Sequence, residues 1–209
     1  GEWERRNEGE KSAEIIAMSI KVDITPKPNK SSGNVTDDAV ACDKFWVAAL
    51  TLMNAEKQTA KSLNKENIET FVATKKEKHK WSDRIKVIER LIIPMVVFVH
   101  TTEEDLPQLR NNKNIRKILS YPGDKIPTRI PDEQIERFKF MLDHSEEPVL
   151  LDNRNLTVGE NIRVIKGPLY GLCGFLLKSY EGESFISISI DGLGMAKTNI
   201  DINYVERIN

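Results

Sequence analysis

The residues best suited to chemistry in this sequence are seven lysines and arginines between positions 75 and 90. They are Lys75, Lys76, Lys78, Lys80, Arg84, Lys86 and Arg90, with His79 and Trp81 among them. Cationic side chains neutralise phosphates, and an aromatic ring beside them can stack on a base. Glu77, Asp83 and Glu89 dilute the charge, so two interpretations stay open: a nucleic-acid contact or a solvated, charged hairpin.

Enzyme chemistry has no comparable pattern. The histidines at 79, 100 and 144 are isolated and lack metal-ligand spacing. Gly171-x-x-Gly174 precedes Lys178-Ser179, but no glycine stands directly before that lysine, so this is not a phosphate-binding loop. No Gly-x-Ser-x-Gly elbow is present. We therefore expect no catalytic residue, no metal and no cofactor.

Composition gives the broad class of the protein. The 209 residues carry 31 Lys+Arg and 32 Asp+Glu, so any basic surface must be local. The two cysteines, Cys42 and Cys173, are far apart, which fits a reducing cytoplasm better than a disulfide scaffold. The longest apolar run, residues 91–99, contains Pro94 and is too short to span a bilayer, so we expect no membrane contact.

The elements that position the basic cluster follow from periodicity. We expect strands at 45–50, 68–72, 91–99 and 115–119. Asn54 can cap a helix over 55–64, and Thr101 with Glu104, or Thr102 with Asp105, can start a short second helix. Pro131 opens a last helix, in which Ile135, Phe138 and Leu142 form one apolar face.

The carboxyl part of the chain has the pattern of a small β-barrel. Ile162 and Val164 lie in one strand-like run and Leu176-Leu177 in another, with Gly167-Pro168, Gly171 and Gly174 between them. Residues 185–190 alternate isoleucine and serine, which predicts a strand with one wet face. Helices here would cost about 1 kcal/mol for each interior glycine and about 3 for proline, so we expect residues 156–209 to be β structure in the free protein.

The predicted organisation is α+β. Residues 1–43 form a partly flexible extension, with a strand signal at 20–24 and a linker composition at 25–34. Residues 44–142 form an amino domain with an antiparallel sheet flanked by helices. Residues 143–155 are a linker, and residues 156–209 form the barrel domain.

Four segments, taken in order, resemble the NusG/RfaH family of transcription elongation factors. They are Trp46 with the Glu56-Lys57 helix, Trp81-Ser82-Asp83-Arg84 followed by residues 91–99, Ile130-Pro131-Asp132-Glu133-Gln134, and Val164 to Gly174. The last is similar to the family's KOW motif. The amino-acid sequences of these segments are most similar to the UpxY type, the antiterminators of capsular-polysaccharide operons.

The resemblance implies a function without catalysis. The amino domain of that family binds the clamp helices of RNA polymerase, bridges the nucleic-acid cleft and suppresses pausing. Its KOW domain recruits a second partner, such as a ribosomal protein or the termination factor Rho. Near Pro94 the sequence departs from the family, because Ile93, Met95 and Val96 replace the usual aromatics and glycine, so aromatic anchoring is expected to be lost.

The resemblance and the charge pattern together give candidate sites. The polymerase-binding residues are Ile92, Ile93, Pro94, Met95 and Val96, and Ile93→Asp should then abolish polymerase binding with the fold retained. The nucleic-acid-binding residues, which contact DNA or nascent RNA, are Lys57, Lys61, Lys76, Lys78, Lys80, Arg84 and Lys86. The KOW residues are Gly159, Arg163, Gly167, Pro168, Gly171 and Gly174. Core packing of the 92–96 run and ordinary surface lysines are the alternatives.

Two other functions stay open. One is the housekeeping elongation factor of the same family. The other is a ribosome-associated KOW protein that binds structured RNA, which would leave residues 46–142 unexplained.

Overall fold

The computed structural model describes residues 43–80, 84–152, 159–178 and 182–208. Residues 1–42 of the predicted extension, residues 81–83, residues 153–158 of the predicted linker and barrel, residues 179–181 and residue 209 lie outside the described residues. The helices are α2 (Glu56–Lys65), α3 (Leu106–Asn111), α4 (Asp132–His144) and the short η1 (Ile202–Tyr204). The strands of the amino half are β1 (Phe45–Thr51), β2 (Glu69–Phe71), β3 (Thr74–Lys80), β4 (Ile85–Leu91), β5 (Val96–Thr101) and β6 (Ile115–Ile118). Those of the carboxyl half are β7 (Val149–Asp152), β8 (Asn161–Val164), β9 (Cys173–Lys178), β10 (Ser184–Ile190), β11 (Gly194–Asn199) and β12 (Val205–Arg207).

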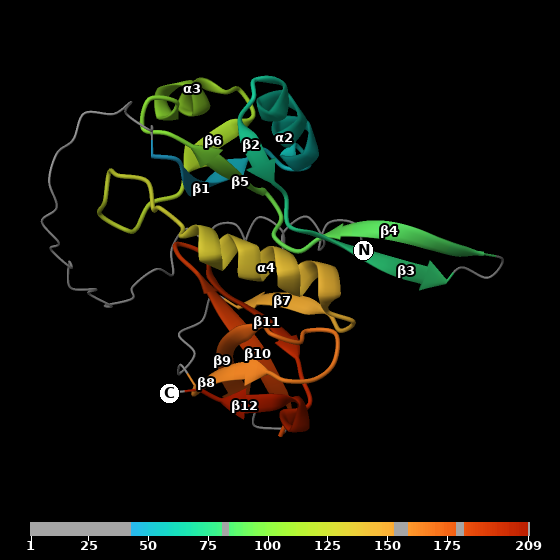
Figure 1. Cartoon of the computed structure of the whole chain (residues 1–209). Helices are drawn as coiled ribbons and strands as arrows, with labels where there is room; N and C mark the ends of the chain where they lie inside the picture. The colour runs from blue at the N-terminus through green and yellow to red at the C-terminus, as the bar shows by residue number, and fades with distance from the viewer. Residues whose placement is uncertain (1–42, 81–83, 153–158, 179–181, 209) are drawn as a thin grey trace, which may run out of the picture.

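The amino half is an antiparallel sheet in the order β2-β5-β1-β6, covered on both faces (Figure 1). Alternate residues of β1 point to opposite faces. Phe45, Val47 and Ala49 pack with α2 and α3, while Trp46 and Ala48 pack on the side of α4. Because both faces are buried, β1 reads as a continuous apolar run, as the sequence predicted.

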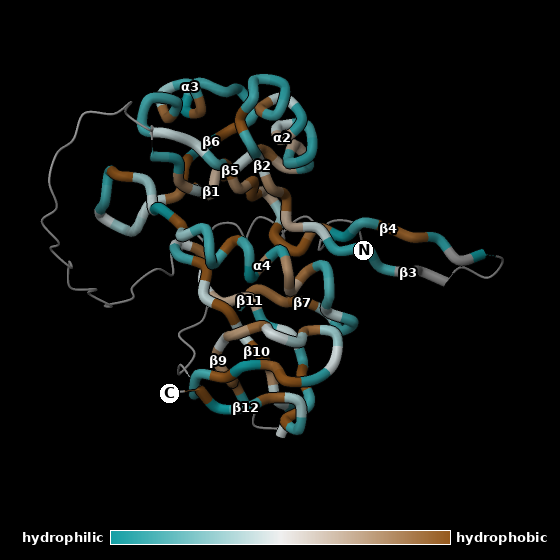
Figure 2. Tube along the Cα trace, viewed as in Figure 1, coloured by the Kyte–Doolittle hydropathy of each residue, from teal (hydrophilic) through white to brown (hydrophobic). Residues whose placement is uncertain are grey.

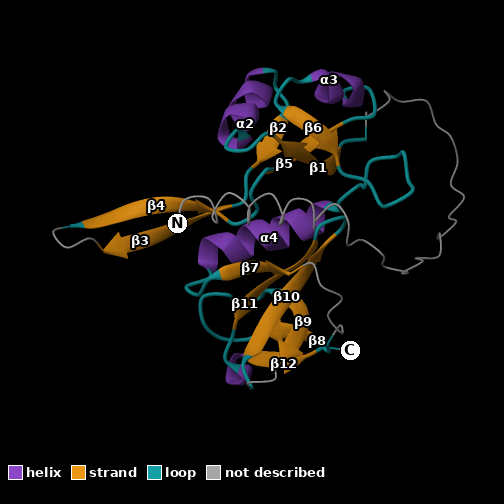
Figure 3. Ribbon diagram, turned by 180° about the vertical axis from the view of Figure 1, so that it is seen from behind, coloured by secondary structure: helices purple, strands orange, loops and turns teal. Residues whose placement is uncertain are grey.

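Helix α4 lies between the amino sheet and the carboxyl half in both ribbon views (Figures 1 and 3). Its Ile135, Phe138, Met141 and Leu142 are buried in a single apolar cluster that also contains residues of the carboxyl strands. Gln134 Oε1 accepts a hydrogen bond from the Asp191 backbone N–H at 2.8 Å. The two halves therefore share one core across α4.

The carboxyl half is an antiparallel sheet in the order β12-β8-β9-β10-β11-β7. Strand β10 was predicted, and it pairs with β9 and β11. The serine face of β10 was predicted to be exposed to solvent, but Ser187 on that face is fully buried. Its Oγ donates a hydrogen bond to the Phe175 carbonyl at 3.1 Å. Strand β7 lies within the predicted linker 143–155, yet it pairs with β11. Burial of Val149 against the shared core explains this position.

Two local predictions for the amino half were wrong. Residues 91–99 are not one strand, because β4 ends at Leu91, β5 begins at Val96, and a turn with Met95 at φ 61° separates them. Asn54 does not cap α2, because it has φ 59° and the N-cap residue is Ala55 without a side-chain hydrogen bond. The Thr102–Asp105 start is present, since Thr102 Oγ1 donates to Asp105 Oδ2 at 3.0 Å and accepts from the Asp105 N–H at 3.3 Å.

Strands β3 and β4 form a separate two-stranded ribbon that projects from the body of the molecule (Figures 1 and 3). Its colouring by hydropathy is mostly hydrophilic, with apolar residues in the middle of β4 (Figure 2). The register places Lys76 opposite Glu89 and Lys78 opposite Val87. The charged segment is therefore a hairpin.

Candidate functional site

The run 92–96, one of the sequence-predicted sites, forms the turn between β4 and β5. Ile93 and Val96 are 0% exposed and Met95 is 8% exposed, whereas Pro94 is exposed and Ile92 is half-buried. Burial leaves Ile93, Met95 and Val96 no surface for a partner in this conformation. Only Pro94 and part of Ile92 can meet one.

A buried carboxylate holds this turn. Glu56, 3% exposed in the first turn of α2, accepts a hydrogen bond from the Met95 N–H at 2.7 Å. The Thr51 N–H donates to the Met95 carbonyl at 2.7 Å. Sequence reasoning missed this role for Glu56. The available signal was its spacing to Thr59, Ala60 and Leu63, which places a carboxylate on the buried face of the helix.

Removal of this carboxylate should loosen the turn. We expect Glu56→Ala to lower the free energy of unfolding by about 1–3 kcal/mol, because the buried Met95 N–H loses its acceptor. Glu56→Gln keeps an acceptor oxygen and should lose less. Urea denaturation measures both variants, with Glu136→Ala on the exposed face of α4 as the matched control. An equal loss of unfolding free energy in Glu56→Ala and in the control would show that the Glu56 carboxylate does not stabilise the turn.

A cluster of aromatic rings lies between the sheet and α4, in the same apolar core that holds Ile93 and Val96. It consists of Trp46, Phe71, Phe98 and Phe138, which come from β1, β2, β5 and α4. Phe71 stacks on Phe98 with centroids 5.6 Å apart, and Phe138 meets both rings edge-on at 6.0 and 6.1 Å. Aromatic residues are thus absent at the turn itself but present in the same core, on elements that are distant in sequence.

The rim of this aromatic cluster is polar and partly exposed. The His100 ring stacks on Trp46 at 4.8 Å, and Lys139 Nζ lies 4.6 Å from the Trp46 centroid. Glu69 joins the two, with Oε2 at 3.0 Å from His100 Nδ1 and Oε1 at 3.8 Å from Lys139 Nζ. Phe71 is the half-buried ring at this rim. The other rings of the cluster are buried, so this rim is the part of the cluster that a partner can reach.

The predicted nucleic-acid residues lie on two elements that the fold brings together. Lys57 and Lys61 of α2 line a groove of about 540 Å³ whose other wall includes Thr74 of β3 and Glu89 of β4. Lys57 Nζ lies 2.5 Å from Glu89 Oε2, and this hydrogen bond lowers the pKa of the Glu89 carboxyl. The helix lysines therefore adjoin the base of the hairpin.

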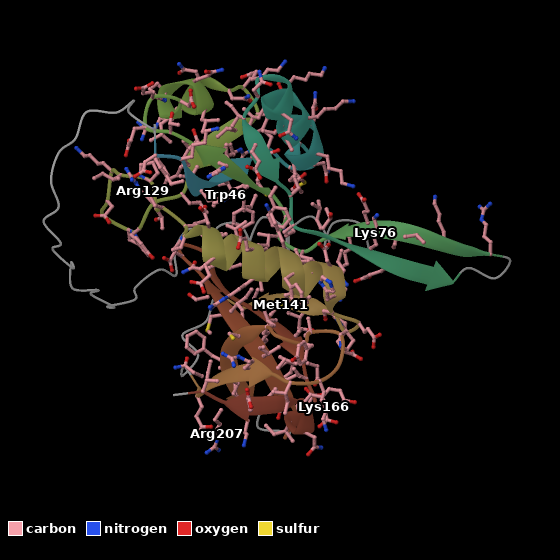
Figure 4. The ribbon with its side chains drawn as sticks, viewed as in Figure 1. Trp46, Lys76, Arg129, Met141, Lys166 and Arg207 are labelled. Atoms are coloured by element: carbon pink, nitrogen blue, oxygen red, sulfur yellow. The ribbon has the colours of Figure 1, made fainter. Side chains whose placement is uncertain are left out.

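The lysines and the arginine of the hairpin differ in exposure. Lys76, Arg84 and Lys86 are exposed, and Figure 4 shows Lys76 on the projecting ribbon. Lys75 is 8% exposed, and its Nζ donates to the Glu147 carbonyl. Burial lowers the pKa of Lys75 in spite of Glu77 and Glu147 nearby. Lys78 and Lys80 occupy alternate positions of β3.

The predicted KOW residues build the start of the carboxyl sheet. A Cβ on Gly159 would lie 1.6 Å from the Leu176 carbonyl oxygen, so only glycine allows this strand approach. Gly167 and Gly171 adopt φ 82° and 86° in the β8–β9 turn, which also contains the exposed Pro168. Arg163 of β8 lies 3.8 Å from Glu206 of β12, and Gly174 approaches the Ser187 carbonyl closely. In this structure these residues shape the turn and the strand contacts of the carboxyl sheet.

The described part of the chain holds neither a metal-ligand cluster nor a membrane-spanning helix. No group of three or more His, Cys, Asp or Glu side chains is placed to hold a metal ion in residues 43–80, 84–152, 159–178 and 182–208. Over the same residues, no helix has the length and apolar character needed to cross a membrane.

Comparison with known proteins gives one family match. Residues 44–139 match the NusG family model, described as transcription termination factor nusG. Among solved structures, the chain is similar to one titled "Domain interaction in Thermotoga maritima NusG", with 18% identity and a TM-score of 0.42 over 80% of this chain and 98% of that one. It is also similar to one titled "Crystal Structure of MjSpt4:Spt5 complex conformation B", with 15% identity and a TM-score of 0.27 over 78% and 97% of the two chains. No curated protein sequence matches significantly.

Proposed function

Because residues 44–139 of this chain match the NusG family, we propose that the protein is a transcription elongation factor that binds RNA polymerase. The family match over the amino domain is the observation that carries the proposal. Its action is binding without catalysis, in the cytoplasm, where polymerase works.

The polymerase contact is assigned to the surface formed by Pro94, the exposed part of Ile92, and the rim at Phe71, His100 and Lys139. This assignment modifies the run 92–96 that was predicted from sequence. It is supported by the exposure of Pro94 and by the half-buried Phe71 ring, whose centroid lies 5.3 Å from Lys139 Nζ. The clamp helices of polymerase are the partner that the family resemblance implies.

Nucleic acid of the elongation complex is assigned to α2 and the hairpin. Support comes from Lys57 and Lys61 along the groove and from the exposed Lys76, Arg84 and Lys86 beyond it. Lys78 and Lys80 complete the set by position in β3. The carboxyl sheet is left to recruit a second partner, for which a ribosomal protein and Rho are the candidates.

A specialised role is the finer part of the proposal. The four family-like segments resemble those of the UpxY-type antiterminators, and the chain departs from the general family around Pro94. We assign it to antitermination of a polysaccharide biosynthesis operon. Read-through of terminators in such an operon, compared with read-through in an unrelated operon, distinguishes this role from that of the housekeeping factor.

The class of function is tested by one binding experiment. The purified full chain is offered to core RNA polymerase and, separately, to ribosomal subunits. We expect binding to polymerase and expect Pro94→Asp to weaken it without loss of fold. Binding to ribosomal subunits alone would favour the RNA-binding alternative.

A further inference from the structure

The β3–β4 ribbon is an isolated element of the described structure. Its strands pair with each other and with no other strand there, and each contains seven residues. At about 3.3–3.4 Å per residue the ribbon is about 23 Å long. Isolated two-stranded hairpins are marginally stable, so this ribbon depends for its order on contacts with the body or with a partner.

The ribbon is strongly cationic in a chain that is not. Residues 74–91 contain seven Lys and Arg against three Asp and Glu, while the whole chain has a formal net charge of -1. Among the described residues, two of these cations are engaged internally: Lys75 with the Glu147 carbonyl, and Arg90 with Glu77 at 3.8 Å. Lys76, Arg84 and Lys86 are exposed, and no ion pair within the described ranges involves them.

The base of the ribbon is fixed to the body. Lys75 ties β3 to the turn between α4 and β7. Lys57 of α2 holds Glu89 of β4, and the Ile92 N–H donates to the Ala73 carbonyl at 2.8 Å. These contacts hold the ribbon in one direction relative to the body, so its exposed cations are presented outward.

We propose that this ribbon binds duplex DNA through the major groove, a proposal that rests on the elongation role and names the nucleic acid at that site. The major groove of B-DNA admits a two-stranded β-ribbon, whereas the deep, narrow major groove of duplex RNA does not. Lys76, Arg84 and Lys86 meet the phosphates. Val87, 56% exposed, lies on the same face of the ribbon as Lys76 and is available for contact with thymine methyl groups. Lys86 lies on the opposite face, so the cations are placed to reach phosphates on both sides of the groove.

The test is the salt dependence of DNA binding by the full chain. Fluorescence anisotropy is measured with a labelled DNA duplex, its single strand and an RNA duplex of the same sequence, over a series of salt concentrations. The test variant is the triple change Lys76→Gln, Arg84→Gln and Lys86→Gln. The control is Lys113→Gln, Lys117→Gln and Lys125→Gln, which removes the same charge from exposed positions elsewhere.

We expect the DNA duplex to bind most tightly. The test variant should flatten the slope of log affinity against log salt by about 2–3, since each phosphate contact contributes about 0.9. The control should keep the original slope. An unchanged slope in the test variant, preference for the single strand or RNA duplex, or no nucleic-acid binding would each overturn the proposal, the last in favour of an acidic protein surface.

The same variants separate this proposal from the elongation role. Polymerase binding without nucleic acid should survive in the test variant, because its three residues lie outside the surface assigned to polymerase. Loss of duplex binding with polymerase binding intact confirms the role of the ribbon. A chain that binds duplex DNA but not polymerase would sink the elongation role alone.

Discussion

Ile93→Asp should unfold the amino half of the protein. Ile93 is 0% exposed and lies in the apolar cluster with Ala73, Val96 and Phe98. An unpaired carboxylate buried there costs several kcal/mol, which is comparable with the whole stability of a domain of about 5–15 kcal/mol. Circular dichroism and urea denaturation should show a lost or strongly weakened transition. This expectation replaces the sequence-based prediction of a folded variant.

Pro94→Asp is the matched control, since it places the same charge on the exposed neighbour. It should remain folded and should weaken polymerase binding. A folded Ile93→Asp protein of normal stability would contradict the burial of this residue. A folded Pro94→Asp protein with unchanged polymerase affinity would move the contact away from the turn.

Cleavage within residues 153–158 should leave the two halves associated. A cut there separates β7 from the rest of the carboxyl sheet in sequence, although β7 pairs with β11 along four residue positions. Ser145 Oγ also lies 2.8 Å from Thr198 Oγ1, and the core continues across α4. Because these contacts survive the cut, the fragments should coelute in size-exclusion chromatography after cleavage at an inserted protease site.

Separate domains would give a different result in this cleavage experiment. Independent domains would give two folded fragments that elute separately and unfold in separate transitions. The uncut protein, treated in parallel, should unfold in one cooperative transition if the shared core couples the halves. Two transitions in the uncut protein would contradict that coupling.

Hydrophobic periodicity correctly predicted the elements that are buried evenly along one face or along both faces. Strand β1 is apolar on both faces because helices cover both, and α4 shows Ile135, Phe138 and Leu142 at helical spacing. It failed at the β4–β5 turn, where the apolar run of residues 91–99 gives no sign that the strand breaks at Pro94. The break depends on the left-handed Met95 and on Glu56, which is distant in sequence. Strand β7 was assigned to the linker because residues 143–155 are mostly polar and contain Pro148.

The candidate site was predicted less completely than the fold. The lysines on α2 and the hairpin were visible as charge, but only the fold shows that Lys57 reaches Glu89 and that Lys75 is buried. The aromatic cluster was not predicted, because its four rings come from four elements and no local pattern joins them. Contacts between distant segments are set by tertiary packing, which single-sequence periodicity does not contain.

In the proposed role, this chain modifies transcript elongation by RNA polymerase. This role is tested most directly by single-round transcription with purified polymerase on a template with a defined pause and terminator. Addition of the full chain should shorten the pause and increase read-through, and Pro94→Asp should reduce both effects. An unchanged pause lifetime and unchanged read-through at saturating protein would contradict this role.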